Sequence, residues 1–157
     1  MDITVRKARK DELDGVNKLR RMVNDIHVNG RPDVFRPGFV DEFKQHIYEV
    51  FDAPNSDVLV ALSDNLLCGF AAVEYIEKPQ SSYSNTRRFY QVTEFGVDHN
   101  FRRKGVATAL ISFIKRDALE RGFHKIELDM WEFNKGALAF YESVGFKTYR
   151  RYMDMDL

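Results

Sequence analysis

The residues whose chemistry is easiest to interpret form a short basic turn and the first positions after it. They are Arg102, Arg103, Lys104, Gly105, Val106, Ala107 and Thr108. An apolar run ending at Val97 predicts a strand before this turn, and apolar spacing after Gly105 predicts a helix beyond it. The start of a helix offers unpaired backbone N–H groups and a positive dipole end, which favour a phosphate or pyrophosphate. The pattern indicates an anion site; the alternative is a solvated basic turn that merely begins a helix.

Gly105 supports the anion site, because a residue without a Cβ lets the backbone approach an anion closely. Two common nucleotide-binding loops are excluded by spacing. No Gly-Lys-Ser/Thr follows, as a P-loop requires. The glycines do not repeat as G-x-G-x-x-G, and the turn follows a late strand instead of an opening βαβ unit.

A second informative segment lies about thirty residues further on, from Asn134 to Phe146. Asn134 suits the N-cap of a helix, and Gly145 suits the position just after its end. Between them, Ala137, Phe140 and Tyr141 share one helix face. Taken alone, this segment predicts only a helix with good caps.

Together and in this order, the two segments resemble the GNAT superfamily of acyl-CoA-dependent N-acetyltransferases. Arg102-x-x-Gly105-x-Ala107 is similar to the family's acyl-CoA loop, Q/R-x-x-G-x-G/A, and Phe95-Gly96-Val97-Asp98 is similar to the strand end before it. Residues 134–146 match the family segment N-x-x-A-x-x-F/L-Y-x-x-x-G-F. The resemblance implies one N-acetyltransferase domain over residues 1–157, with acetyl-CoA as co-substrate and an amine as acceptor.

The resemblance also implies where acetyl-CoA binds. The loop amides hold the pyrophosphate, and the pantetheine arm pairs with backbone near Phe95 and Val97, like an added strand. The cleft opens between two splayed strands that end near Val97 and Trp131. The implied cofactor-binding residues are Phe95, Gly96, Val97, Arg102, Arg103, Lys104, Gly105, Val106, Ala107, Thr108, Asn134, Ala137 and Phe140.

Three residues match catalytic positions of the family. Tyr141 is the implied hydrogen-bond donor or acid for the departing CoA thiolate, with a core aromatic as the alternative. An amine with a pKa of about 10 must lose a proton before it attacks, and Glu94 or Asp129 is the candidate base. Some members keep their carboxylate three residues before Glu94, where this chain has Gln91, so the base stays open. Burial would raise the pKa of such a carboxylate, but a salt bridge or a water relay explains either residue as well.

Two groups of residues are candidates for the acceptor pocket. His27, Asn29, Arg31, Asp33 and Phe35 lie between the first two predicted helices. The other rim is expected at Tyr83, Arg87, Arg88, Phe89 and Tyr90. Both charge signs occur, so a peptide N-terminus, a polyamine and an aminoglycoside all remain open. A non-catalytic acyl-CoA-binding regulatory module and an adenine-nucleotide-binding protein are the alternative functions.

The surrounding elements are predicted from periodicity and breaker residues. Strands are expected over 3–8, 58–62, 66–76, 88–97, 125–131 and 147–155. Helices are expected from an N-cap at Asp11 to His27, with a break at 29–32, and over 38–51, 105–121 and 135–144. The order β-α-α-β-β-β-α-β-α-β predicts an α/β fold, a mixed twisted sheet with helices on both faces.

Composition limits the remaining possibilities. The 157 residues are 44% hydrophobic and 31% charged, with a net charge of zero, which argues against a broad nucleic-acid or membrane-surface role. Cys68 is the single cysteine and lies in an apolar stretch, so a buried thiol is expected and no disulfide forms within the chain. Four scattered histidines predict no metal site. We expect a cytoplasmic monomer or homodimer without signal peptide or membrane helix.

Overall fold

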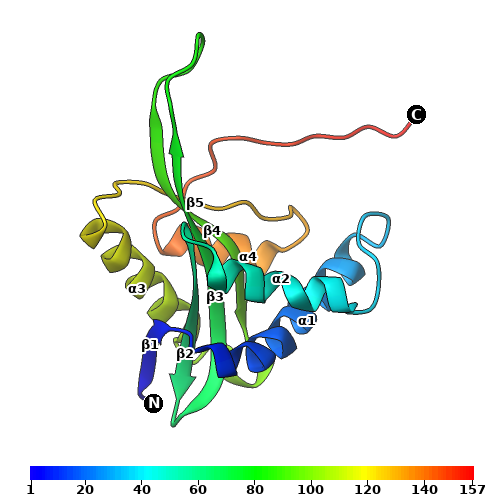
Figure 1. Cartoon of the computed structure of the whole chain (residues 1–157). Coiled ribbons are helices and arrows are strands. Elements are labelled where there is room, and N and C mark those ends of the chain that lie inside the picture. Colours follow the sequence, from blue (N-terminus) through cyan, green and yellow to red (C-terminus); the bar gives the residue numbers. More distant parts are fainter.

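A computed structural model describes all 157 residues, and its centre is a five-stranded sheet in the order β1-β2-β3-β4-β5 (Figure 1). The strands are β1 (Ile3–Lys7), β2 (Ser56–Ser63), β3 (Leu66–Lys78), β4 (Arg87–Val97) and β5 (Ile126–Glu127). The first three pairings are antiparallel, and β4 pairs with β5 in parallel. The α/β class with a mixed sheet is therefore confirmed.

Helices cover both faces of this sheet. They are α1 (Leu13–Gly30), α2 (Asp41–Asp52), α3 (Val106–Glu120) and α4 (Lys135–Ser143), with short 3-10 turns at Lys10–Glu12 and His99–Phe101. Successive side chains of β2 point to opposite faces of the sheet, so the hydrophobic core has two parts, one on each face. Val58 and Val60 pack with the first two helices, whereas Leu59 packs with Ile111 and Ile114 of α3. No helix is long and apolar enough to cross a membrane.

Close packing brings α1 against the middle of the sheet near the end of β4. A Cβ on Gly96 would lie 2.7 Å from a methyl of Val23 and 2.8 Å from the ring of Phe70. Because no side chain fits between them, α1 and β4 can approach closely. This contact fixes one wall of the cleft described below.

Cys68 lies fully buried on β3, in a small cluster with Ala61, Val106 and Leu110. Its Sγ donates to the carbonyl of Ala61 at 3.3 Å, and burial raises the pKa of the thiol. The expectation of a buried cysteine is confirmed.

Three predicted helix boundaries are wrong in the N-terminal third of the chain. Helix α1 begins at Leu13, because residues 10–12 form a 3-10 turn whose Glu12 carboxylate accepts from the Arg9 N–H and from Arg6. It continues through Gly30 instead of ending at His27, because Gly30 packs directly on the ring of Phe133. Helix α2 begins at Asp41, three residues later than expected.

Two predicted strands near the C-terminus are also wrong in extent. The strand expected over 125–131 pairs only at Ile126–Glu127, because the following residues turn away from β4 to line the cleft. No strand forms over 147–155. Those residues make no backbone hydrogen bond within the chain, since they extend away from the body without an edge to pair with (Figure 1).

Candidate functional site

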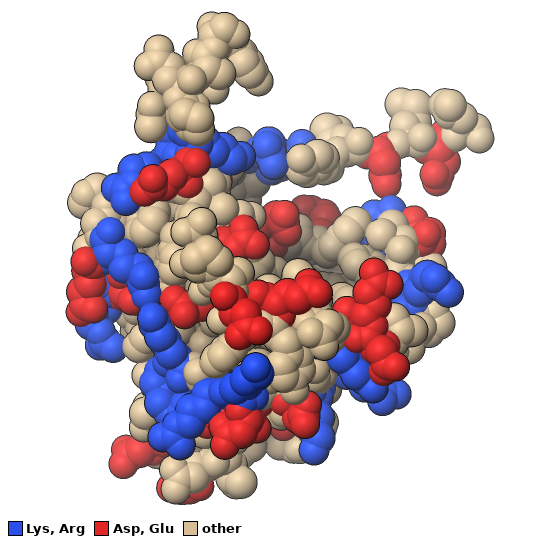
Figure 2. Space-filling model, viewed as in Figure 1, with Lys and Arg blue, Asp and Glu red and all other residues tan.

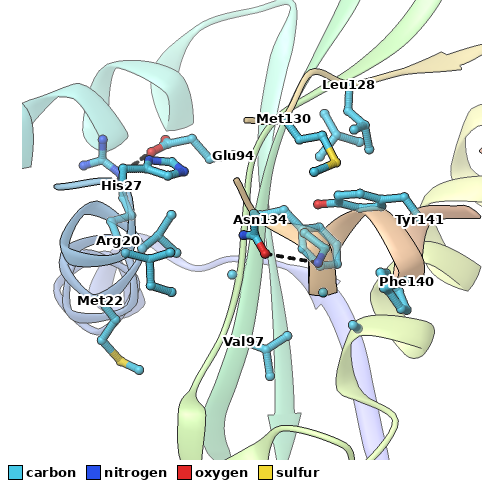
Figure 3. Close-up of a pocket in the computed structure, with 18 of the residues that line it drawn as sticks. Arg20, Met22, His27, Glu94, Val97, Leu128, Met130, Asn134, Phe140 and Tyr141 are labelled. Carbon is cyan, nitrogen blue, oxygen red and sulfur yellow. Dashed lines mark hydrogen bonds and ion pairs between the residues drawn. The ribbon is translucent and has the colours of Figure 1, made fainter. Parts of the chain in front are cut away.

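The main cleft has a volume of about 830 Å³ and opens where β4 and β5 diverge. The ladder between these strands holds only at Tyr90–Ile126 and Gln91–Glu127. Beyond it, the end of β4 forms the back of the cleft, with α1 on one side and residues 128–131 and α4 on the other (Figure 3). The two strands diverge as expected, but β5 ends at Glu127, so Trp131 lines the cleft from the segment that follows the strand, whereas Val97 lines it from the end of β4.

One end of the cleft is built from the start of α3. The N-cap is Gly105, whose φ of 86° lies in the left-handed region, and Arg103 before it also has a positive φ of 59°. The N–H groups of Val106, Ala107 and Thr108 have no acceptor within the chain, and all three residues line the cleft. Unpaired amides, the helix dipole and the side chains of Arg102 and Arg103 suit a pyrophosphate.

Lys104 is the one predicted cofactor-binding residue that does not line the cleft. Its ammonium group lies 5.5 Å from the centre of the Phe101 ring instead. The other predicted residues of this group line it: Phe95, Gly96, Val97, Arg102, Arg103, Gly105, Val106, Ala107, Thr108, Asn134, Ala137 and Phe140.

The free edge of β4 offers a second way to hold an extended ligand. From Val92 to Val97 the strand pairs with β3 on one side, but it has no partner on the β5 side. Phe95, Gly96 and Val97 lie on this stretch and line the cleft. The backbone there can accept an extended chain as an added strand.

Tyr141 projects from α4 into the middle of the cleft, with its hydroxyl directed toward the wall that carries Glu94 (Figure 3). Asn134 caps this helix by accepting from the N–H of Ala137 at 3.1 Å. The Tyr141 ring packs against Phe95, Phe140 and Phe146, at centroid distances of 5.5 to 6.0 Å. Burial raises the pKa of Tyr141 to about 12, so the hydroxyl keeps its proton at neutral pH. It has no hydrogen-bond partner in the chain and can donate to a ligand.

Glu94 lies across the cleft from Tyr141 and is paired with Arg20 of α1 (Figure 3). The Arg20 Nε lies 2.9 Å and 3.2 Å from the two carboxylate oxygens. Arg20 is itself held by Asn17 and by the carbonyl of Phe43, and its side chain is fully buried. The Glu94 side chain keeps 24% exposure. The carboxylate is thus fixed in orientation while still reachable from the cleft.

Sequence reasoning missed Arg20, although a signal was present. Arg20 falls between Val16 and Val23 at helical spacing, on the same apolar stripe that predicts the core face of α1. A charged residue on a buried stripe needs a buried partner. Most other missed lining residues are apolar and have no distinguishing pattern, among them Met22, Val23, Ile26, Phe43, Val92, Leu128 and Met130; the polar Asn24 and Thr93 also line the cleft.

Asp129 also lines the cleft, but it is exposed and makes no hydrogen bond within the chain. Asp129 is therefore an exposed carboxylate beside the cleft, and its assignment as a base stays a prediction. The chain turns outward after β5, so this side chain stays in contact with water at the mouth.

Aromatic side chains close the end of the cleft opposite α3. His27 stacks on Phe35 at 4.9 Å, and Phe35 meets Trp131 edge to face at 5.2 Å. This contact joins the α1 side of the cleft to the β5 side. Burial lowers the pKa of His27, and the negative charge of Glu94 partly opposes this shift. His27 and Phe35, two of the residues predicted for the acceptor pocket, therefore line the cleft.

The remaining acceptor candidates lie outside the cleft. Arg31 packs over Trp131 and pairs with Asp33 and Asp154 on the surface, and Asn29 is exposed. The second predicted rim is wrong: Tyr83, Arg87, Arg88, Phe89 and Tyr90 belong to the hairpin loop and the first half of β4, before the strands diverge. No group of three or more His, Cys, Asp or Glu side chains could hold a metal ion.

Comparison with known proteins places this geometry in a family context. The family model described as "Acetyltransferase (GNAT) family" matches residues 20–146. An N-alpha-acetyltransferase of Saccharolobus solfataricus is 28% identical, over 93% of this chain and 81% of that protein. N-acetyltransferase 8 of Homo sapiens is 28% identical over 56% of this chain, which spans only 37% of that protein.

Solved structures share the fold at low sequence identity. A mutant of the BH1408 protein from Bacillus halodurans superposes with a TM-score of 0.93 at 23% identity, covering 98% of this chain and 99% of that one. The aminoglycoside N-acetyltransferase AAC(6')-Iy in complex with CoA gives a TM-score of 0.75 at 19% identity, covering 99% and 95%.

Proposed function

The chain belongs to the acetyltransferase (GNAT) family, and from this premise we propose that it transfers the acetyl group of acetyl-CoA to a primary amine. The transfer takes place by direct attack while both substrates are bound. The observation that carries this proposal is the position of the Tyr141 hydroxyl, between a pyrophosphate-type site and a carboxylate-bearing pocket in one cleft.

The residues at the α3 end fit acetyl-CoA. The amides of residues 106–108 with Arg102 and Arg103 would hold the pyrophosphate, and the free edge of β4 near Phe95 and Val97 would hold the pantetheine arm. When bound, acetyl-CoA supplies an acetyl group activated as a thioester, which an uncharged amine can attack with release of the CoA thiolate.

The opposite wall would prepare the amine. A primary amine with a pKa of about 10 is mostly protonated at neutral pH, so a group in the cleft must take its proton. Glu94 is our candidate, because its carboxylate faces the cleft and is held in place by Arg20. Asp129 at the mouth would attract the cationic amine before it reaches Glu94.

Tyr141 would act on the leaving group. Its hydroxyl is protonated, has no partner in the chain and points into the cleft. Donation of this hydrogen bond stabilises negative charge that develops on sulfur, which is the interaction that lowers the barrier. Holding both substrates in one cleft supplies the rest of the rate enhancement through orientation.

The test is a screen of amines that follows release of free CoA thiol from acetyl-CoA. Aminoglycosides are in the panel because structural neighbours are named aminoglycoside acetyltransferases. Peptides with a free N-terminus are included because a relative is named an N-alpha-acetyltransferase, and polyamines because the sequence leaves them open. Turnover with at least one amine is the expected result. Tight CoA binding without turnover of any amine would favour a non-catalytic acyl-CoA-binding module instead, and stabilisation by ATP as strong as by CoA would favour an adenine-nucleotide-binding protein.

A further inference from the structure

Five side chains line the end of the cleft that lies opposite the start of α3, and they form what we call the apolar subsite: His27, Phe35, Leu128, Met130 and Trp131. Leu128 and Met130 lie on the Tyr141 side of the cleft, whereas His27 lies on the side of Glu94 (Figure 3). Burial lowers the pKa of His27, so its ring is largely uncharged at neutral pH. A group that is attached to the amine and extends away from acetyl-CoA therefore meets an uncharged, mostly apolar surface.

The rings of the apolar subsite are held in place from behind. The Phe35 ring stacks on His27 at 4.9 Å and meets Trp131 edge to face at 5.2 Å. Phe133 contacts His27 from outside the cleft, with ring centroids 6.4 Å apart, and it packs directly on Gly30, where a Cβ would lie 2.2 Å from the Phe133 ring. The subsite therefore offers preformed flat surfaces, which suit a ring.

Negative charge is scarce at this end of the cleft. Glu94 and Asp129 are the only acidic residues that line the cleft, and Glu94 is already paired with Arg20 at 2.9 Å. One carboxylate is thus left for the charge of an acceptor, whereas a polyamine or an aminoglycoside brings several ammonium groups. On the face seen in Figure 2, basic and acidic side chains are interspersed, and the net charge of the chain is zero, so the surface as a whole does not attract polycations.

A negatively charged acceptor is not favoured either. Arg20 is the only Lys or Arg that lines the cleft outside the α3 end, and its side chain is 0% exposed. The rings of Phe43 and Phe39 lie against its guanidinium, with centroids at 4.4 Å and 5.6 Å, and its Nη2 is buried away from solvent. A carboxylate on the acceptor would therefore find no accessible positive charge beside the apolar subsite.

We propose that the acceptor is a primary amine with a single positive charge and one ring-sized apolar group, and that the apolar subsite buries this group. The inference rests on the proposed function, because it takes the amine nitrogen to lie between the Tyr141 hydroxyl and Glu94. The ring packs against Phe35 and Trp131, and Asp129 balances the charge of the arriving ammonium group. A free arylalkylamine and a peptide with an aromatic first residue both present this chemistry. Polyhydroxylated or polycationic acceptors would leave polar groups unpaired on the same surface.

The first test compares kcat/KM for four amines with acetyl-CoA, each value corrected for the uncharged fraction of the amine. Phenethylamine and ethylamine differ by one ring, and the ring should raise kcat/KM about 30-fold, a typical gain from burying such a group. Spermidine and kanamycin should both have a lower kcat/KM than phenethylamine. Equal values for phenethylamine and ethylamine, or a higher value for spermidine or kanamycin, overturn the proposal while the acetyltransferase function stands. No turnover of any amine contradicts both.

Two tripeptides distinguish the sources of the ring. Phe-Gly-Gly carries it beside a peptide N-terminus, and Ala-Gly-Gly is the control without it. A higher kcat/KM for Phe-Gly-Gly than for phenethylamine assigns the subsite to peptide N-termini, and the reverse assigns it to free arylalkylamines; both results support the proposal. A preference for Ala-Gly-Gly over Phe-Gly-Gly contradicts it, because a ring beside the amine would then hinder binding.

A matched pair of variants tests where the ring binds. Phe35→Ala removes one ring of the apolar subsite, so the ratio of kcat/KM between phenethylamine and ethylamine should fall about tenfold. Phe39→Ala removes an equal ring from the same loop, but Phe39 packs on Phe43 and does not line the cleft, so the ratio should keep its wild-type value. Calorimetric titration with CoA shows whether each variant is folded. Equal ratios in the two variants contradict burial of the ring against Phe35.

Discussion

At the residue scale, the Tyr141 hydroxyl is the group whose loss is most informative. Tyr141→Phe keeps the ring that packs against Phe95, Phe140 and Phe146, and removes only the donor. We expect kcat to fall about 10²-fold, a typical value for general-acid assistance, while the affinity for acetyl-CoA stays nearly constant. Steady-state kinetics and calorimetric titration with CoA measure the two quantities.

The pH dependence of the same variant adds a second check. Because the pKa of Tyr141 is raised to about 12, the wild-type hydroxyl remains a donor throughout the accessible pH range. The defect of Tyr141→Phe should therefore be equally large at pH values of about 7 and about 9. An unchanged kcat would reduce Tyr141 to a packing residue.

Glu94 should show the opposite behaviour. Glu94→Gln keeps the shape of the side chain but cannot take the proton of the amine. We expect kcat/KM for the amine to fall about 10²-fold at neutral pH and to recover as the pH rises, because bulk water then deprotonates the amine. Asp129→Asn is the matched control: it should raise KM for a cationic amine and leave kcat unchanged. A Glu94→Gln defect that persists at high pH would assign Glu94 a structural role with Arg20.

Residues whose role depends on the local backbone, such as helix caps, could be predicted from the sequence. Residues whose role depends on a contact with a distant part of the chain could not. Gly105 and Asn134 are recognisable because caps and tight turns depend on a few neighbouring positions. The partner of Glu94 lies 74 positions away on α1, and no local pattern joins the two. Tyr83 and Tyr90 are predicted at a rim of the acceptor pocket, but the point at which β4 and β5 separate decides which residues line the cleft, and both residues lie before that point.

At the scale of elements, the start of α3 depends on the left-handed backbone of Gly105. Gly105→Ala has room for its Cβ, since the nearest heavy atom is the Ile3 Cδ1 at 4.0 Å. The cost is conformational, about 1–2 kcal/mol for a residue with a Cβ in this region. When the strained turn relaxes, we expect the N–H groups of residues 106–108 to change direction. CoA binding should then weaken about tenfold, as measured by calorimetry.

Gly122 provides the control at the other end of the same helix. Its φ of 81° imposes a similar strain, no atom lies within 4 Å of an added Cβ, and it does not line the cleft. Gly122→Ala should lower the melting temperature as much as Gly105→Ala does, with CoA affinity unchanged. If both variants lose CoA affinity equally, the effect comes from global destabilisation and the loop is not the anion site.

Strands show most clearly what a sequence can and cannot predict. Residues 66–76 and residues 147–155 are both predicted as strands, yet only the first segment forms a strand within the chain. A helix satisfies its own backbone, whereas a strand needs a neighbouring edge at the correct place. The failed prediction at 147–155 therefore concerns pairing and says nothing against the β-character of those residues.

At the scale of the whole molecule, His27 links the cleft to stability in acid. Burial lowers its pKa below the ordinary value of 6.5, so the native state holds fewer protons on His27 than the unfolded state does. Above pH 6.5, neutral His27 takes nothing from the free energy of unfolding. As the pH falls below 6.5 toward the pKa of the native state, the unfolded state takes up a proton more readily, and the free energy of unfolding decreases. His27→Gln should flatten this part of the curve of unfolding free energy against pH, measured with urea. Parallel curves for the two proteins would show that His27 titrates freely.

The burial of Cys68 has a practical consequence for every thiol measurement on this protein. Its Sγ is enclosed by the sheet and α3, so a thiol reagent can modify it only after the sheet opens. The native protein should therefore contribute no signal to a colorimetric assay of released CoA thiol. Slow modification over hours should instead report the population of opened molecules. Because the chain has one cysteine, this modification should reach no more than one label per chain. Saturating CoA should slow that modification by the factor by which it favours the closed state. Rapid labelling of the native protein would mean that β3 opens far more often than its burial allows.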